Sequence, residues 1–554
     1  MSIHITGAGG APGIVLGRAV LHLPAKVDPT VAYSSIEDAL AHLAAAQTAA
    51  VQALSTLGER LRGEGHNQEA DIFDAQALMA EDPLLSDEIA RRMRQQGVSL
   101  IDAIAATVGQ MRADLEVLDD PYLRERAADM DAIGSSILAA LRGDTGGLRD
   151  LPVGTIIVTP DLTPTETAEL RGGLVAGFAT AYGGPAGHTA ILAHALGIPA
   201  VIGLGAAVLE IKDGTELILD GAAALLIADP GPHERADYTR RATALQAAHI
   251  GRQTLRDLPG QTADGHKIAL WANIAHPDEA RLALEHGAEG IGLFRTEFLF
   301  LGRAAPPSEN EQFDAYRQTL ETMAGRTVVI RTIDIGGDKS LPYLDMPHED
   351  NPFLGARALR LCMRRPDLFA TQLRALLRAA VHGDLWIMLP MVATLDDLRW
   401  GRAQLVAAAA ALAVAGVPHR PDVRLGIMIE TPAAAVTAEL LAREADFFSI
   451  GSNDLTQYAM AADRGLADLA ARYPHDSPAV LRLIALAAEA AQQAGIPIGI
   501  CGELAGVPAA TLLLAGLGLN ELSMAPASIP LIKERLRQIT QAQAQEMAAE
   551  ALLR

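Results

Sequence analysis

One pattern repeats eight times in the second half of this chain, and it restricts the possible folds more than any other feature. After Gly265, a short run rich in Val, Ile, Leu and Phe is followed each time by a stretch with helical spacing. Alternating strands and helices form parallel sheets, and eight such units close a (β/α)8 barrel. The predicted strands are 268–274, 290–294, 327–333, 385–391, 424–429, 447–450, 497–500 and 521–524. We therefore predict a TIM barrel over residues 261–554, with catalytic groups at the carboxyl ends of its strands.

The first half follows two other patterns. Short β-rich runs near 11–21, 155–158, 173–178 and 216–220 predict one α/β domain. Between Ser35 and about Arg142 the spacing is helical, with breakers at Gly63, Gly65, Pro83, Gly97 and Pro121. We expect an all-α helical domain, residues 25–145, inserted into an α/β domain made of residues 1–24 and 146–229. The Ala-, Arg- and Gln-rich segment 230–260 is expected to be a linker helix.

Composition excludes several classes of function. The formal net charge is −22 and only 4% of the residues are aromatic. Because that charge repels phosphate backbones and anionic membranes, and few rings are available for base stacking, we expect no nucleic-acid or membrane partner. The amino terminus lacks the features of a signal peptide, and no apolar run reaches the ~18 residues of a membrane span. With only two cysteines, which cannot form a disulfide framework, a cytoplasmic protein is expected.

The predicted helical domain is strongly acidic. Residues 26–144 include 21 acidic and 10 basic side chains, so about half of the net charge lies there. Two interpretations are open: an acidic face in contact with solvent, or a docking surface for a basic partner.

Four arginines lie near the carboxyl ends of predicted barrel strands or in the segments after them: Arg295, Arg331, Arg357 and Arg464. A single arginine at a strand end is usually a surface residue. Guanidinium groups bind carboxylates and phosphates in bidentate fashion, so four at one barrel mouth favour a small, highly anionic substrate.

Two carboxylates and a thiol follow the fifth, sixth and seventh predicted strands. Glu430 and Asp454 are either structural hydrogen-bonded carboxylates or ligands of Mg²⁺, which proteins hold with one or two carboxylates, waters and substrate phosphate. Asn453 is placed to hold a phosphate oxygen beside the metal. Cys501 can exchange a proton with a carbon centre or pack as a small hydrophobe, and Cys362, inside a helical stretch, is given the second interpretation.

A glycine-rich loop, Gly183-Gly184-Pro185-Ala186-Gly187, precedes His188 and a helical stretch. Such a loop offers unpaired backbone N–H groups to an anion, and a neutral imidazole can accept a phosphoryl group as a phosphoramidate. The alternative is a structural histidine. His194, further along, is expected on the helix surface.

These motifs resemble, in the same order and over nearly the whole chain, the phosphoenolpyruvate-protein phosphotransferase family, Enzyme I of the bacterial sugar phosphotransferase system. The shared motifs are Leu-Thr-Pro-Thr-Glu-Thr-Ala from 162, Gly-Gly-x-x-x-His-Thr-Ala-Ile-Leu-Ala, Gly-Leu-Phe-Arg-Thr-Glu-Phe-Leu, Ile-Arg-Thr-Ile-Asp-Ile-Gly-Gly-Asp-Lys, Met-Ile-Glu-Thr-Pro-Ala-Ala, Ser-Asn-Asp-Leu-Thr-Gln-Tyr and Cys-Gly-Glu-Leu-Ala-Gly. The resemblance implies a swivelling phosphohistidine α/β domain, an inserted helical domain that binds the carrier protein HPr, and a barrel that binds phosphoenolpyruvate (PEP) and forms a homodimer.

The resemblance also implies roles for single residues. His188 would be phosphorylated, and Cys501 would protonate C3 of enolpyruvate. Glu430 and Asp454 would coordinate Mg²⁺. The implied substrate contacts are Arg295 and Arg331 to the phosphate, with Asn453, Arg464, Lys339 and Arg357 in the same pocket. The implied HPr-facing residues, which favour the docking interpretation of the acidic domain, are Glu69, Asp71, Asp74, Glu81 and Asp82.

The implied reaction moves the phosphoryl group of PEP to His188 and then to a histidine of HPr, releasing pyruvate, as the first step of the sugar phosphotransferase system. A hinge near residues 230–260 would let His188 reach both partners. Gly187 departs from the family, which usually has a hydroxyl residue there, and the lost hydrogen bond is worth about 0.5–1.5 kcal/mol. This departure leaves open a non-catalytic scaffold that binds HPr-like partners. PEP synthase or pyruvate, phosphate dikinase is a further alternative, but it needs a nucleotide-binding domain for which the chain has neither room nor a glycine motif.

Overall fold

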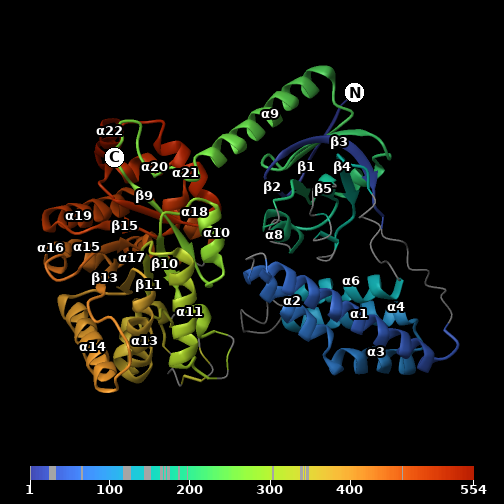
Figure 1. The fold of residues 1–554 in the computed structure, drawn as a ribbon. Coiled ribbons are helices and arrows are strands. Elements are labelled where there is room, and N and C mark those ends of the chain that lie inside the picture. The colour runs from blue at the N-terminus through green and yellow to red at the C-terminus, as the bar shows by residue number, and fades with distance from the viewer. Residues whose placement is uncertain are drawn as a thin grey trace. The chain divides into compact units, whose positions relative to one another are not determined.

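The computed structural model describes residues 2–23, 33–63, 67–116, 127–142, 151–162, 166–167, 170, 175–184, 188–195, 197–301, 303, 305–336, 341, 343–344, 349–464 and 466–553. The chain divides into two compact units, Met1–Ala248 and His249–Arg554 (Figure 1).

A mixed eight-stranded sheet organises the first unit, in the order β1-β8-β7-β3-β4-β5-β6-β2. Strands β3 to β6 pair in parallel, and the remaining pairs are antiparallel. This sheet confirms the predicted α/β domain. Its strands are β1 (Ile3–Thr6), β2 (Gly9–Ala11), β3 (Ile14–Leu21), β4 (Thr155–Thr159), β5 (Val175–Thr180), β6 (Ala200–Ile202), β7 (Glu216–Asp220) and β8 (Leu225–Ala228), and helix α8 (His188–Ala195) lies between β5 and β6 in sequence.

A helical bundle is inserted between β3 and β4, which are parallel neighbours in the sheet. Its helices are α1 (Ile36–Gly63), α2 (Asn67–Ala80), α3 (Pro83–Gln96), α4 (Leu100–Glu116) and α6 (Ala127–Arg142). Ala39, Leu43, Ala46 and Ala50 recur at helical spacing on α1 and are buried in the bundle core. The predicted breakers act as expected where the structure describes them: Pro83 opens α3, and Gly97, with φ 66°, ends it.

Helix α9 (Pro232–Thr254) runs across the boundary between the two units. In the first unit, Arg241 on this helix pairs with the buried Asp220 at 2.7 Å. In the second unit, Arg252 pairs with Glu534 at 3.2 Å, and the buried Lys533 donates to the carbonyl of Arg256 at 2.9 Å. Each end of the helix is therefore bound to its own unit.

The second unit is a closed barrel of eight parallel strands, as predicted. They are β9 (Ala269–Ile274), β10 (Ile291–Arg295), β11 (Val328–Arg331), β12 (Leu385–Leu389), β13 (Arg424–Ile429), β14 (Phe448–Ile450), β15 (Ile498–Ile500) and β16 (Glu521–Met524). The α-helices of this unit after α9 are α10 (Glu279–Glu285), α11 (Glu309–Met323), α12 (Leu359–Arg364), α13 (Pro366–Ala379), α14 (Leu395–Val414), α15 (Pro432–Val436), α16 (Ala438–Leu441), α17 (Ser452–Met460), α18 (Ala467–Arg472), α19 (Pro478–Ala494), α20 (Thr511–Gly516), α21 (Ile529–Leu536) and α22 (Gln541–Leu553).

The barrel has two apolar layers. A large core fills the space between strands and helices, and a smaller cluster that includes Leu293, Met388, Met428 and Cys501 fills the interior. The interior cluster forms a floor below the carboxyl ends of the strands, so polar side chains gather above it. None of the helices described is both long enough and apolar enough to span a bilayer.

Candidate active site

A polar cavity of about 260 Å³ opens at the carboxyl ends of the barrel strands. Its lining residues come from β10, β11 and β13 and from the segments that follow β10, β11, β13, β14 and β15: Leu293, Arg295, Glu297, Phe298, Arg331, Asp334, Met428, Glu430, Gly451, Asn453, Asp454, Arg464, Cys501, Gly502 and Glu503. Seven of the residues predicted from strand-end positions therefore line one cavity: Arg295, Arg331, Glu430, Asn453, Asp454, Arg464 and Cys501.

Arg331, at the end of β11, is buried between two carboxylates. Its guanidinium donates to Glu297 at 2.8 Å and contacts Asp334 at 3.0 Å. Burial alone would lower the pKa of Arg331, but the two carboxylates outweigh burial and raise it. The arginine therefore stays charged although it is buried.

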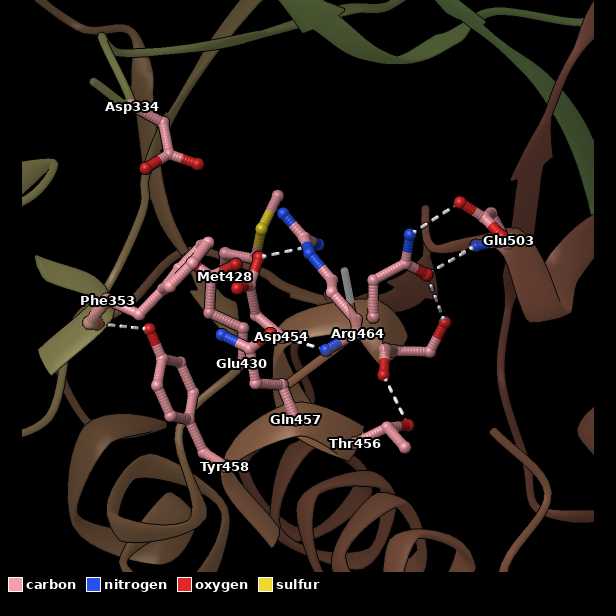
Figure 2. Close-up of polar contacts among 12 residues, drawn as sticks. Asp334, Phe353, Met428, Glu430, Asp454, Thr456, Gln457, Tyr458, Arg464 and Glu503 are labelled. Atoms are coloured by element: carbon pink, nitrogen blue, oxygen red, sulfur yellow. Dashed lines mark hydrogen bonds and ion pairs between the residues drawn. The ribbon is translucent and has the colours of Figure 1, made fainter. Parts of the chain in front are cut away.

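Arg357 continues this arrangement from the loop after β11. It forms bidentate pairs with Asp334, at 2.9 and 3.0 Å, and with Asp454, at 2.8 and 3.1 Å. Arg464 reaches the same Asp454 at 3.4 Å (Figure 2). The result is an alternating charge ladder: Glu297, Arg331, Asp334, Arg357, Asp454 and Arg464.

Arg295 differs from the arginines of the ladder. It ends β10 and lines the cavity, yet it has no hydrogen bond or ion pair within the described part of the chain. Burial and the neighbouring Arg331 lower its pKa, which means that its positive charge is incompletely compensated. An anion in the cavity would supply the missing compensation.

Glu430, directly after β13, lines the cavity and is 1% exposed, as buried as Glu297. Met391, held at φ 56°, donates its backbone N–H to this carboxylate at 2.6 Å. A positive φ is unusual for a methionine and is typical of strain retained at functional sites. Burial and the nearby Asp454 and Asp334 raise the pKa of Glu430 to about 8.

The carboxylates Glu430 and Asp454 fit a divalent cation. Neighbouring buried carboxylates repel each other, and a bound cation relieves that repulsion. A carboxylate can accept about four hydrogen bonds. Asp454 accepts three from arginines, which leaves one position for a cation. Among the residues described, no group of three or more His, Cys, Asp or Glu is arranged to hold a metal. Two carboxylates with remaining positions for water and phosphate match the way proteins hold Mg²⁺.

Asn453 and Glu503 form the opposite rim of the cavity. The Asn453 amide donates to Glu503 at 2.9 Å, and the backbone N–H of Glu503 donates back to its oxygen at 3.0 Å (Figure 2). On the other side, Tyr458 donates to the carbonyl of Phe353 at 2.6 Å, tying α17 to the loop that carries Arg357. These bonds fix the first turn of α17, where Asn453 and Asp454 lie.

Cys501 follows β15 at the floor of the cavity and is 2% exposed. Burial raises the pKa of its thiol to about 12, against a smaller lowering by Ser449. The group is therefore a protonated thiol at neutral pH, which suits a proton donor better than a nucleophile. Cys362 is also buried, in the core outside the barrel, as expected of a small hydrophobe.

Four residues singled out from the sequence lie outside the cavity lining or cannot be fully described. Arg357 is 4% exposed and lies behind Asp454 without lining the cavity, so its contacts are with carboxylates. Lys339 and Gly187 lie outside the described residues. His188 is the first residue of α8, although its side chain lies outside the described part, and His194 on the same helix is exposed as predicted.

The predicted partner surface lies at the junction of α2 and α3. Glu69 and Asp71 are on α2, with side chains outside the described part, and Asp74, Glu81 and Asp82 are exposed. Asp82 also caps α3 by accepting the N–H of Leu84 at 2.9 Å. Two leucines that the sequence analysis did not single out, Leu78 and Leu84, are 73% and 68% exposed beside these acids.

The sequence analysis also missed three residues that shape the cavity. Glu297 and Asp334 appear only inside quoted motifs, and both turn out to be buried partners of arginines. Their positions just after β10 and β11 are the signal that could have identified them. Met391 could not have been found, because nothing in its sequence neighbourhood indicates a positive φ.

Comparison with known proteins agrees with this geometry. Three models of PEP-utilising enzymes match the chain: the N-terminal region over residues 6–126, the mobile domain over 151–224, and the PEP-binding domain over 250–541. The chain belongs to the PEP-utilising enzymes.

Several relatives of this PEP-utilising enzyme are named phosphoenolpyruvate-protein phosphotransferase. Those from Bacillus sp. (strain S) and Geobacillus stearothermophilus are each 42% identical over 98% of this chain and 94% of theirs. The one from Bacillus subtilis (strain 168) is 40% identical over 99% of this chain and 97% of its own. The similarity to these relatives thus covers nearly the whole of this chain.

Proposed function

We propose that this enzyme transfers the phosphoryl group of PEP to His188 and from there to a histidine of HPr, releasing pyruvate. The observation that carries the proposal is Arg295, a cavity-lining guanidinium without a partner in the described chain, next to buried carboxylates and a protonated thiol. A phosphate group, a divalent cation and an enol carbon are the three chemical features that such a set recognises.

Phosphoryl transfer depends mainly on positioning and on compensation of charge. Arg295 would take the phosphate directly, because no carboxylate in the described part of the chain forms an ion pair with it. Arg331 is held by Glu297 and Asp334 and would contribute a fixed positive charge beside it. The His188 ring nitrogen then attacks phosphorus as the bond to the enol oxygen breaks, and Asn453 and Arg464 orient the substrate from the opposite rim.

Glu430 and Asp454 would hold Mg²⁺, with Asn453 adjacent. When bound, the ion supplies positive charge that neutralises the phosphate oxygens. Hydrogen bonds hold the two carboxylates in place: the backbone N–H of Met391 orients Glu430, and Arg357 and Arg464 orient Asp454.

Cys501 would complete the first half-reaction by donating its proton to C3 of the enolate. Because burial keeps the thiol protonated, the proton is in place before the enolate forms. Conversion of the enol to the more stable keto form drives phosphoryl transfer forward. The thiol lies at the carboxyl end of its strand, where catalytic groups of barrels are found.

The junction of α2 and α3 would bind HPr. Support comes from the exposed leucines Leu78 and Leu84 beside Asp74, Glu81 and Asp82, since apolar anchors ringed by charge are typical of protein interfaces. Glu69 and Asp71, on the same α2, would extend the acidic part.

We also propose a role for each domain of the chain. Residues 1–24 with 146–229 would carry the phosphohistidine, 25–145 would bind HPr, 230–260 would link, and 261–554 would bind PEP and form a homodimer. The motion of His188 between its two partners would come from the linker. We place the protein in the cytoplasm.

The decisive experiment uses PEP labelled in its phosphoryl group. With Mg²⁺, the wild type should take up one label per chain, and His188→Ala should take up none. His194→Ala is the matched control, because His194 lies on the same helix and is exposed, and it should label like the wild type. A scaffold would take up no label in any variant, and a dikinase-like enzyme would take up label from ATP without PEP.

A further inference from the structure

Glu521, the first residue of β16, is a buried acid that the reaction above does not use. Its Oε1 is buried and has no hydrogen-bond partner in the described structure. The residue as a whole retains some accessible surface. A buried carboxyl without a partner costs free energy, so its retention in a barrel interior calls for a reason.

Two glycines make room for this carboxyl. A Cβ at Gly499 on β15 would lie 1.7 Å from Glu521 Oε2, and a Cβ at Gly292 on β10 would lie 2.7 Å from Oε1. Either distance is too short for real atoms. The carboxyl therefore occupies the volume that side chains at both positions would need.

The same geometry places Glu521 directly below Cys501. Gly499 and Cys501 are two residues apart at β15, so they face the same side, about 7 Å apart along the strand. The carboxyl fills the Gly499 position, and in its ionised form it would raise the pKa of the Cys501 thiol. Ser523, also on β16, donates to Asn273 at 2.7 Å, and Asn273 donates to the Cys501 carbonyl at 2.9 Å, which fixes the two strands at this level.

Repeated turnover requires that Cys501 be reprotonated. Once Cys501 has protonated the enolate, it is left as a thiolate that is 2% exposed, and it must regain a proton before the next PEP can react. Burial raises the pKa of Glu521 well above its ordinary value, so the group is a neutral acid at neutral pH with a proton to give.

We propose that Glu521 returns a proton to the Cys501 thiolate after each turnover. The inference rests on the proposed function, in which Cys501 protonates the enolate. The O–H bond of Glu521 breaks and the S–H bond of Cys501 forms, directly or through one water. The carboxylate then takes a proton from water at the amino-terminal end of the barrel, where β16 begins, and no electron transfer is involved.

The groups around Glu521 are consistent with this role. Cys501 is the titratable group that faces it from β15, with Arg331 and Glu430 acting on the thiol from the cavity side. Gly292 on β10, Asn273 on β9 and Ser523 on β16 itself carry no charge. No neighbouring base thus competes with the thiolate for the proton, within the part of the chain described.

The test separates the first turnover from later ones. In Glu521→Gln, rapid-quench measurement with excess PEP and Mg²⁺ should show an unchanged first phosphorylation, because the thiol starts protonated. Steady-state pyruvate release with HPr as acceptor should fall roughly tenfold to hundredfold, the range of a lost acid–base group. Glu521→Asp should recover part of the steady state, and Glu489→Gln, an exposed change on α19, should alter neither phase.

Exchange of the pyruvate methyl protons in D₂O, followed by ¹H NMR with Mg²⁺ present, provides a readout that does not need HPr. This proton exchange should slow about tenfold in Glu521→Gln. The double variant Glu521→Gln with Cys501→Ala should exchange no more slowly than Cys501→Ala alone. An unchanged steady state, or a first turnover slowed as much as later ones, would overturn the inference. If Glu521→Gln does not fold, Glu521→Asp tests the same split. Failure of the proposed function itself would look different, since the wild type would then release no pyruvate from PEP.

Discussion

At the scale of single residues, the contrast between Arg295 and the ladder arginines predicts different roles in substrate affinity. Arg295→Met should raise KM for PEP by about tenfold to hundredfold, because a charge-assisted hydrogen bond is worth ~1.5–3 kcal/mol and 1.4 kcal/mol is tenfold. The fold should persist, since no described contact is lost. Arg281→Met, an exposed change on α10, is the matched control and should leave KM unchanged.

Glu430 predicts how metal affinity depends on pH. Its pKa of about 8 means that the carboxyl holds a proton below that pH, and a bound cation must displace it. Affinity for Mg²⁺, measured by calorimetry, should rise by up to about tenfold per pH unit between pH 6 and 8 and level off above. Affinity that is flat over this range would contradict the role of Glu430 as a ligand.

The same group links pH to stability with the opposite sign. The raised pKa means that the folded protein binds this proton more tightly than the unfolded chain does. The contribution of Glu430 to the free energy of unfolding is therefore fully present below about pH 4.5 and is lost as the pH rises through 8. Glu430→Gln should flatten this part of the pH dependence of the free energy of unfolding, which denaturant titration can measure.

At the scale of elements, the junction of α2 and α3 predicts a loss of partner binding without loss of fold. Leu78→Ser with Leu84→Ser should weaken HPr binding at least tenfold while leaving the melting temperature nearly unchanged, because both side chains are exposed. Leu486→Ser, a 47% exposed leucine on α19, is the control. Surface plasmon resonance against HPr would measure the difference.

The sequence was most informative about elements and strand ends. Eight barrel strands could be predicted because buried parallel strands are short apolar runs, and Arg295, Arg331 and Glu430 because the carboxyl ends of such strands meet at one rim. The partner of each arginine could not be predicted, since pairing depends on the path of the loop that buries Arg357 between Asp334 and Asp454. The same holds for Glu521, whose burial depends on two glycines from other strands.

At the scale of the whole molecule, substrate binding and phosphorylation should be separable. PEP with Mg²⁺ should raise the melting temperature of His188→Ala as much as it raises that of the wild type before the wild type consumes the PEP. The reason is that the residues lining the cavity all belong to the second unit. Ligand at 100 times its Kd stabilises by about 2.7 kcal/mol. Calorimetry would detect this shift, and its absence in His188→Ala would place substrate-binding groups outside the barrel.

The charge ladder also limits how this rim can change over generations. Each inner member pairs with two neighbours, so replacing one removes a partner from two opposite charges and leaves the remaining charges unbalanced, a cost of several kcal/mol. Replacements of members in contact are not additive, so a second change can restore what the first removed. Sequence drift at these positions should therefore proceed by paired exchanges. Arg295, which pairs with no residue that the structure describes, is free of that constraint and is retained for what it binds.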